Sequence, residues 1–374
     1  MKRFIYADIA ATTKLDIDAF EAMKTYMLDE YGNASQPYSF ARKPKNALRD
    51  ARATIAKCIN ADPEEIFFTS GGTESDNWAI KGTVCSDIKA STIITSSIEH
   101  HAVLRACQEI ERFGGTVKYL PVNSQGLISP AQLEREINEH TRLVSIMLAN
   151  NEVGTIEPLT ELCAIAHKYG ALFHTDAVQA VGHWLIDVRA SGVDMLSASA
   201  HKFNGPKGIG FLYIKKGTPI HPYVNGGSQE YGMRAGTENV AAIVGMALAL
   251  KKHSETLEDD KKYLLHLENV FLNALKDANI DFIRNGALEH IPGNISLSIR
   301  NADGEAILHR LDLLGISVST GSACDSVNTQ VSHVLKALKV SDDYIKGTIR
   351  ISLSCMNTLE EVQIIASKLI SILS

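Results

Sequence analysis

Short runs of β-branched and aromatic residues alternate with segments of helical periodicity between about residues 66 and 214. This alternation is typical of parallel strands joined by crossover helices, and it predicts an α/β domain. Most of the runs are largely apolar, as expected of strands that are covered on both faces. The candidate strands are 66–69, 92–95, 116–120, 143–147, 171–174 and 210–214.

A different pattern begins near residue 250. An apolar helix predicted over 240–250 is followed by a charged segment, 251–262, and then by a long helix whose apolar residues recur every three or four positions. We place a domain boundary near residue 255. The rest of the chain indicates a compact α+β domain, with strands at 294–299, 316–318 and 348–353, a helix at 305–314, and a last helix that Thr358 and Glu361 open as a capping box.

The chain has 374 residues, enough for two or three folding units, and its 45% hydrophobic and 21% charged residues are ordinary for a globular protein. A formal net charge of −6 gives no basic surplus, so we expect no direct binding of nucleic acid and no membrane association. The longest apolar stretch, 240–250, is shorter than the ~20 residues that span a bilayer. Asp8 interrupts the N-terminus before a signal-peptide region develops, and we expect a cytoplasmic protein.

Residues 70–77, Ser-Gly-Gly-Thr-Glu-Ser-Asp-Asn, follow a predicted strand and open a predicted helix. Two glycines at the positive end of a helix let an anion approach free backbone N–H groups, which predicts a phosphate cradle. Taken alone, a tight turn with Thr73 and Asp76 as a capping box explains the same residues better.

Asp176 and Lys202 add an acid and an amine to the predicted phosphate cradle. Asp176 follows a strand, where open α/β sheets bind ligands, although a single aspartate there is more often a helix cap. Lys202 ends a short strand-like run among small residues, where a lysine can lose its charge and form an imine, although most lysines only solvate a surface. Together they match pyridoxal phosphate, which requires an anion site, an acid for the pyridine nitrogen and an amine for the Schiff base.

The chain resembles the NifS/IscS-like cysteine desulfurases, within the class V aminotransferase group of fold-type-I pyridoxal phosphate enzymes. The resemblance implies an α/β large domain, residues 12–255, with a mainly parallel seven-stranded sheet covered by helices. It also implies a smaller α+β domain made of residues 1–11 and 256–374. The motifs that carry the resemblance, in order, are 6–13, 69–77, 99–100, 150–154, 176–179, 201–202, 234–239, 321–324 and Arg350.

The resemblance also implies a role for each matching residue. Lys202 would bind the cofactor covalently and move the substrate Cα proton, and His100 would stack over the ring and relay protons. Asp176 would pair with the pyridine nitrogen, and Gln179 with the phenolic oxygen. The phosphate would be bound by Gly72, Thr73, Ser199 and His201, and by Thr237 of the other subunit of a homodimer. The substrate carboxylate would be bound by Asn151, which also contacts the cofactor, and by Arg350.

Cys324 is the residue that separates desulfurases from their transaminating relatives. The other five cysteines are scattered, with no Cys/His cluster at zinc spacing, and are interpreted as inert thiols. By the resemblance, Cys324 would attack the sulfur of L-cysteine, become a persulfide and release L-alanine. The persulfide would supply an acceptor protein such as an iron–sulfur scaffold, and Cys324 could itself be a transient iron–sulfur ligand.

Three alternatives use the same residues. A class V aminotransferase would leave Gly-Ser-Ala-Cys, 321–324, without a task, whereas a selenocysteine lyase would use the same cofactor and lysine. A non-catalytic sulfur-carrier scaffold is disfavoured because the lysine, the acid and the thiol are all present. The sequence departs from the family at Ile9 and Tyr38. By the resemblance, we also expect no C-terminal tail of the kind with which longer members dock a scaffold.

Overall fold

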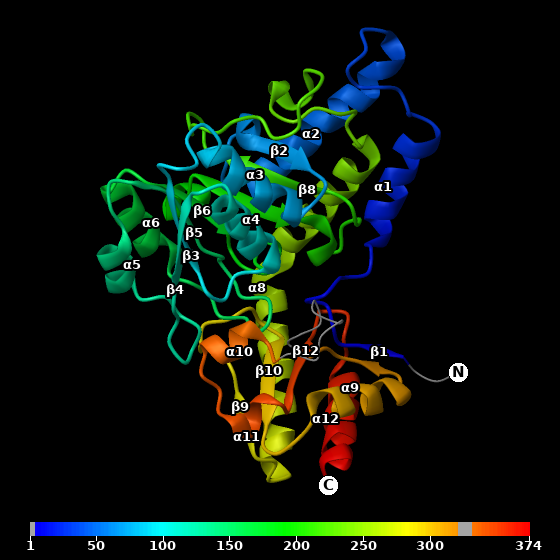
Figure 1. Cartoon of the computed structure of the whole chain (residues 1–374). Helices are drawn as coiled ribbons and strands as arrows, with labels where there is room; N and C mark the ends of the chain where they lie inside the picture. Colours follow the sequence, from blue (N-terminus) through cyan, green and yellow to red (C-terminus); the bar gives the residue numbers. More distant parts are fainter. Residues whose placement is uncertain (1–3, 321–330) are drawn as a thin grey trace.

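The computed structural model describes residues 4–320 and 331–374. Figure 1 shows a larger body that contains the central sheet and a smaller body that contains the first strand and the last helix. One long helix, α8 (Val240–Asp277), runs from the larger body into the smaller one.

Seven strands form the central sheet in the order β2-β8-β7-β6-β5-β3-β4. The pairs from β4 to β7 are parallel, and β8 is antiparallel to both of its neighbours. The predicted α/β class with a mainly parallel seven-stranded sheet is therefore confirmed. The strands are β2 (Ile66–Thr69), β3 (Thr92–Ser96), β4 (Thr116–Leu120), β5 (Thr141–Ser145), β6 (Leu172–Asp176), β7 (Met195–Ser199) and β8 (Gly210–Ile214).

Helices cover both faces of this sheet (Figure 1). Trp78 and Ile80 of α3 and Val103 of α4 pack on one face, and apolar residues of α2, α6 and α8 belong to the larger core on the other. The helices of this part are α1 (Ile17–Leu28), α2 (Arg42–Cys58), α3 (Gly72–Val84), α4 (His101–Arg112), α5 (Pro130–Glu136), α6 (Leu159–Lys168) and α7 (Val188–Ser191).

The smaller body contains a three-stranded antiparallel sheet, β12-β10-β9, and a parallel pair, β1 with β11. Its own apolar cluster includes Leu267 and Phe271 of α8, Ile295 and Ile351 of the sheet, and Ile365 of the last helix. The elements are β1 (Ile5–Tyr6), β9 (Phe282–Arg284), β10 (Asn294–Ile299), α9 (Gly304–Leu313), β11 (Ile316–Ser317), α10 (His333–Ala337), α11 (Asp342–Ile345), β12 (Thr348–Ser352) and α12 (Leu359–Leu373).

The long helix α8 corrects one prediction. The sequence pattern separates an apolar helix at 240–250 from a later helix by the charged segment 251–262, but the structure has one helix of 38 residues. The charged segment contains four Lys and two Glu, which are good helix formers, and it has neither Gly nor Pro, so the helix can continue through it. The boundary placed near residue 255 therefore lies inside a helix.

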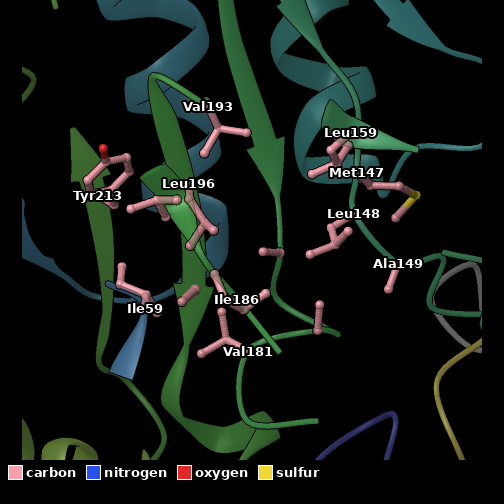
Figure 2. Packing of buried hydrophobic residues seen from close by; sticks show 14 of the residues in the cluster. Ile59, Met147, Leu148, Ala149, Leu159, Val181, Ile186, Val193, Leu196 and Tyr213 are labelled. Atoms are coloured by element: carbon pink, nitrogen blue, oxygen red, sulfur yellow. The ribbon is translucent and has the colours of Figure 1, made fainter. Parts of the chain in front are cut away.

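The largest apolar cluster packs beside the central strands. Figure 2 shows part of this cluster, including Leu148, Leu159, Ile186 and Leu196. All four side chains are less than one-tenth exposed, so this side of the sheet supplies a large share of the buried apolar surface. Within the described ranges, no helix combines the length and the apolar character needed to cross a membrane.

Candidate active site

One cavity of about 500 Å³ lies where β6 and β7 end and α3 begins. This is the edge of an open α/β sheet at which ligands bind. Nine of the twelve site residues predicted from the sequence line it: Gly72, Thr73, His100, Asn151, Asp176, Gln179, Ser199, His201 and Lys202.

Two glycines at the start of α3 let other groups approach its backbone closely. Gly71 is the N-cap residue, with φ +148°, a conformation that side-chain-bearing residues rarely adopt. A Cβ on Gly72 would lie 2.5 Å from Cγ2 of Val178, so only glycine fits there. The alternative interpretation, a capping box of Thr73 and Asp76, is wrong, because Asp76 is buried and no side chain caps this helix. The open N-terminus of a 13-residue helix suits an anionic group.

Asp176 is the last residue of β6 and is 4% exposed. Its Oδ1 accepts a hydrogen bond from the Val178 N–H at 2.9 Å, and the chain forms turns rather than a helix beyond it. Burial raises the pKa of Asp176, whereas His100 and Lys202 act in the opposite direction. A buried carboxylate at this point attracts a cationic group from the cavity.

His100 is the N-cap residue of α4 and lines the same cavity. Its Nδ1 accepts a hydrogen bond from the Ala102 N–H at 3.1 Å, which leaves the neutral ring with its proton on Nε2. Burial lowers the pKa of His100, with Lys202 contributing in the same direction. The imidazole is therefore neutral at physiological pH and can accept a proton or donate one.

Lys202 ends the short 3₁₀ turn Ala200–Lys202, which directly follows β7. Its Nζ donates hydrogen bonds to the carbonyl oxygens of Ala10 and Ala11, at 2.5 and 2.9 Å. Gln179 Nε2 donates to the same Ala10 carbonyl at 3.0 Å. The amine is thus held at the cavity by the N-terminal segment, rather than solvating an open surface.

Ser199 directly precedes the lysine turn, and His201 lies within it. A Cβ on Gly71 would lie 3.4 Å from Ser199 Oγ, which places that hydroxyl against the start of α3. The ring of His201 shares a hydrogen bond with Thr12 Oγ1 at 3.2 Å. Burial, with help from Lys202 and Lys207, lowers the pKa of His201 to about 4. His201 is therefore a neutral hydrogen-bonding group beside the proposed anion site.

Arg350 lies in β12 and is 5% exposed. Its Nη1 donates to the Asn151 carbonyl at 2.8 Å, and its Nη2 donates to Asp8 Oδ1 at 2.8 Å. Arg350 does not line the cavity. It is hydrogen-bonded to Asn151, however, and Asn151 does line the cavity. The guanidinium of Arg350, which was predicted to bind a substrate carboxylate, is therefore already paired through Nη2 with the carboxylate of Asp8.

Two predicted residues stand apart from the cavity. Thr237 does not line it and has an exposed side chain. Arg234, close to it in the chain, donates from Nε to Glu74 Oε1 at 2.8 Å and so ties this loop to the first turn of α3. Cys324, predicted as nucleophile and as transient iron–sulfur ligand, lies outside the described residues. Among the residues that are described, no group of three or more His, Cys, Asp or Glu could hold a metal ion.

Sequence reasoning gave no site role to four residues found here: Asp8, Thr12, Asp76 and Lys207. Thr12, Asp76 and Lys207 line the cavity, and Asp8 pairs with Arg350. Asp8, Thr12 and Asp76 fall inside motifs that were recognised as segments. Their contacts join positions as much as 342 residues apart, which no local pattern reveals.

Nearly the whole chain matches a known protein family. The model of the class-V aminotransferases matches residues 5–365. The chain belongs to this family. The family, including its cysteine desulfurases, depends on pyridoxal phosphate. The chain is 47% identical to the cysteine desulfurase IscS of Dictyoglomus turgidum, over 97% of this chain and 92% of that protein. It is 45% identical to the cysteine desulfurase IscS of Methanosarcina thermophila, over 96% and 89%.

Solved structures agree with these sequence relatives. A NifS-like protein superposes with a TM-score of 0.93 at 38% identity, covering 99% of both chains. A structure of SspA in complex with cysteine superposes with a TM-score of 0.84 at 34% identity, covering 94% of this chain and 99% of that one. The predicted resemblance to NifS/IscS-like enzymes is confirmed.

Proposed function

We propose that this protein is a pyridoxal phosphate-dependent cysteine desulfurase that converts L-cysteine to L-alanine and passes the sulfur to Cys324. The observation that carries the proposal is a single cavity lined by Lys202, Asp176 and the glycine-opened N-terminus of α3. Relatives named cysteine desulfurase, at 42–47% identity over most of the chain, support the choice of reaction.

The residues that line the cavity fit the cofactor. The backbone of Gly72 and Thr73, with Ser199 and His201, would hold the phosphate at the helix N-terminus. Asp176 would keep the pyridine nitrogen protonated, because a buried carboxylate favours a nearby cation. The remaining contacts would come from Gln179 at the phenolic oxygen, Asn151 and the His100 ring. When bound, the cofactor supplies a ring that accepts the electron pair left by the departing Cα proton.

Lys202 and His100 would transfer protons as general acids and bases. Lys202 Nζ, held at the carbonyls of Ala10 and Ala11, can exchange those contacts for the cofactor and the substrate Cα proton. His100 enters the reaction neutral, with Nδ1 engaged by a backbone N–H, so its Nε2 is the atom available to the cavity. The two groups give the site one primary amine and one neutral imidazole.

Arg350 would orient the substrate carboxylate through its planar, two-pronged guanidinium. To do so it would exchange the Asp8 contact for the substrate, while the Asn151 carbonyl keeps Nη1 fixed. Because both states pair the guanidinium with one carboxylate, the buried charge is never left uncompensated.

Cys324 would act as a thiolate on the substrate sulfur. The Cβ–Sγ bond of L-cysteine breaks, and a sulfur–sulfur bond forms between that Sγ and Cys324. The electron pair of the broken bond stays on Cβ and takes up a proton, which gives the methyl group of alanine. Cys324 then carries a persulfide, which a second thiol or an acceptor protein removes. We propose an iron–sulfur scaffold as acceptor, a transient cluster contact at Cys324, and a cytoplasmic homodimer in which Thr237 reaches the partner's phosphate site.

Product analysis tests this function. Purified protein loaded with pyridoxal phosphate is incubated with L-cysteine and a reductant, and sulfide and alanine are measured together. Equal amounts of both products support desulfuration, and replacement of L-cysteine by L-selenocysteine in a parallel assay measures the preference between sulfur and selenium. Loaded protein that forms neither sulfide nor alanine would exclude the proposed reaction.

A further inference from the structure

Asp76 is a buried carboxyl group to which the proposed mechanism gives no task. It lies in the second turn of α3, it is 1% exposed, and it belongs to the lining of the proposed cofactor cavity. Its Oδ1 has no hydrogen-bond partner. A fully buried carboxylate with an unpaired oxygen is costly, so this position requires an explanation.

A chain of hydrogen-bonding side chains crosses three adjacent strands and ends at Asp76. Ser145 Oγ on β5 lies 2.8 Å from His174 Nδ1 on β6, and His174 Nε2 lies 2.9 Å from Ser197 Oγ on β7. Asp76 lies at the end of this chain, with its Oδ1 3.7 Å from the same His174 Nε2. The Ser197 hydroxyl also acts on the carboxyl group of Asp76 and lowers its pKa, against the effect of burial. His174 and Asp176 are two residues apart on β6 and so face the same side of the sheet. The chain therefore runs directly beside the proposed cofactor partner.

The charges around Asp76 favour its neutral form. The carboxyl groups of Asp176 on β6 and of Glu99, just beyond β3, both raise the pKa of Asp76. Among residues 4–320 and 331–374, its one ion-pair contact is His174, with Nε2 3.7 Å from Oδ1. Burial lowers the pKa of His174 to about 3, so this ring brings no positive charge. Burial, with Asp176 in second place, raises the pKa of Asp76 well above its ordinary value.

We propose that Asp76 is a positioning residue: a neutral carboxylic acid that donates its proton to Ser197 and leaves Asp176 as the carboxylate that faces the cofactor ring. Two buried carboxyl groups that repel each other do not readily ionise together, and Asp176 is the one for which His100 and Lys202 oppose the effect of burial on the pKa. The inference rests on the proposed cofactor site and adds to it a residue that acts through Ser197 and His174.

The donor order of the chain follows from this assignment. If the neutral Asp76 donates its proton to Ser197, then the Ser197 hydroxyl in turn donates to His174 Nε2. The proton of the His174 ring then lies on Nδ1, which donates to Ser145. An ionised Asp76 reverses this order, because it would accept from Ser197, which would accept from His174 Nε2–H. The tautomer of His174 therefore reports the proton on Asp76, and ¹⁵N chemical shifts distinguish its two forms.

Infrared spectroscopy tests the proton directly. Cofactor-loaded protein is prepared with aspartate labelled with ¹³C in the side-chain carboxyl group, and the carbonyl stretch of protonated carboxylic acids is recorded at pH 7. We expect one label-sensitive band that disappears in Asp76→Asn and persists in Glu157→Gln, the matched change of a buried carboxyl away from this cavity. No such band in the wild type, or a band that persists in Asp76→Asn, would overturn the assignment.

The visible absorption of the bound cofactor tests the positioning role. Asparagine resembles the neutral acid, so Asp76→Asn should shift the pH midpoint of the absorption change by less than about 0.3 unit, whereas loss of an adjacent negative charge would shift it by about one unit or more. Asp76→Ala should weaken cofactor retention about 10-fold, as loss of an outer contact does, and Asp76→Asn should restore it. A midpoint shift of a full unit in Asp76→Asn would contradict the proposal.

Separate measurements test the protonation of Asp76 and the desulfurase activity. The infrared band concerns Asp76 alone and does not depend on turnover, while sulfide formation tests the desulfurase function. If Asp76→Ala does not fold, the wild-type band, its loss in Asp76→Asn and the His174 tautomer still decide the question.

Discussion

Along β6 and β7, neighbouring residues face opposite sides of the central sheet. On the side of α3 lie His174, Asp176 and Ser197, which line or adjoin the proposed cofactor cavity. On the reverse side, Thr175 and Leu196 line a second cavity, of about 430 Å³, whose lining includes seven leucine, isoleucine and valine residues. One pair of strands thus supplies polar groups to one face and apolar packing to the other.

Both faces bury carboxyl groups, and the comparison shows what separates a functional group from a structural one. Asp176 has His100 and Lys202 to oppose the effect of burial on its pKa. Glu157 on the reverse side accepts from the Ile128 N–H at 3.0 Å and has one unpaired oxygen. Burial raises the pKa of Glu157 to about 8, and no cation opposes this shift. Glu157 therefore has burial without an opposing charged side chain, whereas the amine of Lys202 opposes part of the effect of burial on Asp176.

The largest expected effect is on the polar face. Lys202→Ala should lower alanine formation on the order of 10³-fold, because it removes the group that moves the Cα proton. Lys215→Ala, a half-exposed lysine just past β8, should leave the rate unchanged. Alanine release under saturating L-cysteine measures both. Comparable activity in the two variants would remove Lys202 from the mechanism.

The reverse face should instead affect folding. Leu196→Ala removes a side chain that is 1% exposed, and it should lower the free energy of unfolding by about 3 kcal/mol. The variant should still bind the cofactor once folded, because Leu196 faces away from that cavity. Urea unfolding and visible absorption give the two readings. A normal unfolding free energy together with lost cofactor would reverse the assignment of the two faces.

Removal of the charge of Asp176 tests the electrostatic part of the comparison. Asp176→Asn keeps the shape and the hydrogen bond from Val178 but no longer stabilises a protonated ring nitrogen. We expect about a 100-fold lower kcat, the usual cost of losing one preorganised electrostatic contact. Asp76→Asn is the matched control in the same cavity and should retain most of the activity. Equal losses in both variants would show that the two carboxyl groups share the charge.

The effect that is smallest per step of the experiment concerns a change of one pH unit and Glu157. Its folded-state pKa, about 8, lies above the unfolded value near 4.5, so the folded protein binds one more proton between these values. Stability should therefore decrease as pH rises through this window, by at most about 1.4 kcal/mol per pH unit from this group. Glu157→Gln should remove that contribution, so its stability relative to the wild type should increase from pH 5 to pH 8.

Urea unfolding at several pH values measures the Glu157 effect. Glu161→Gln, on the rim of the same cavity, is the control and should follow the wild-type pH dependence. A stability difference between Glu157→Gln and the wild type that does not change with pH would mean that Glu157 is ionised in the folded protein.

Much of this organisation follows from local sequence signals. Apolar runs separated by helical patterns predict the strands, because buried parallel strands must be apolar on both faces. Residues 70–77, Asp176 and Lys202 each follow a strand, so their common location at one edge of the sheet is predictable from topology. The capping box at Thr358 and Glu361 also forms as predicted.

The rest depends on contacts that no local pattern encodes. The Arg350–Asp8 pair joins residues near the two ends of the chain. The contacts that link Ser145, His174, Ser197 and Asp76 exist only because three strands and one helix are assembled. A buried pair between Arg52 and Glu230, 2.6 Å apart, is a further example, since its partners are 178 residues apart. The continuity of α8 was missed because a charged segment resembles a linker when its helix propensity is ignored.

One measurement tests the central claim most directly. Cofactor-loaded protein is exposed to one equivalent of L-cysteine without reductant, and the alanine released is compared with the sulfur found on each cysteine-containing peptide by mass spectrometry. Our account predicts one sulfur atom added at Cys324 for each alanine released. Alanine release with no added sulfur at Cys324, or with sulfur distributed over the other cysteines, would contradict it.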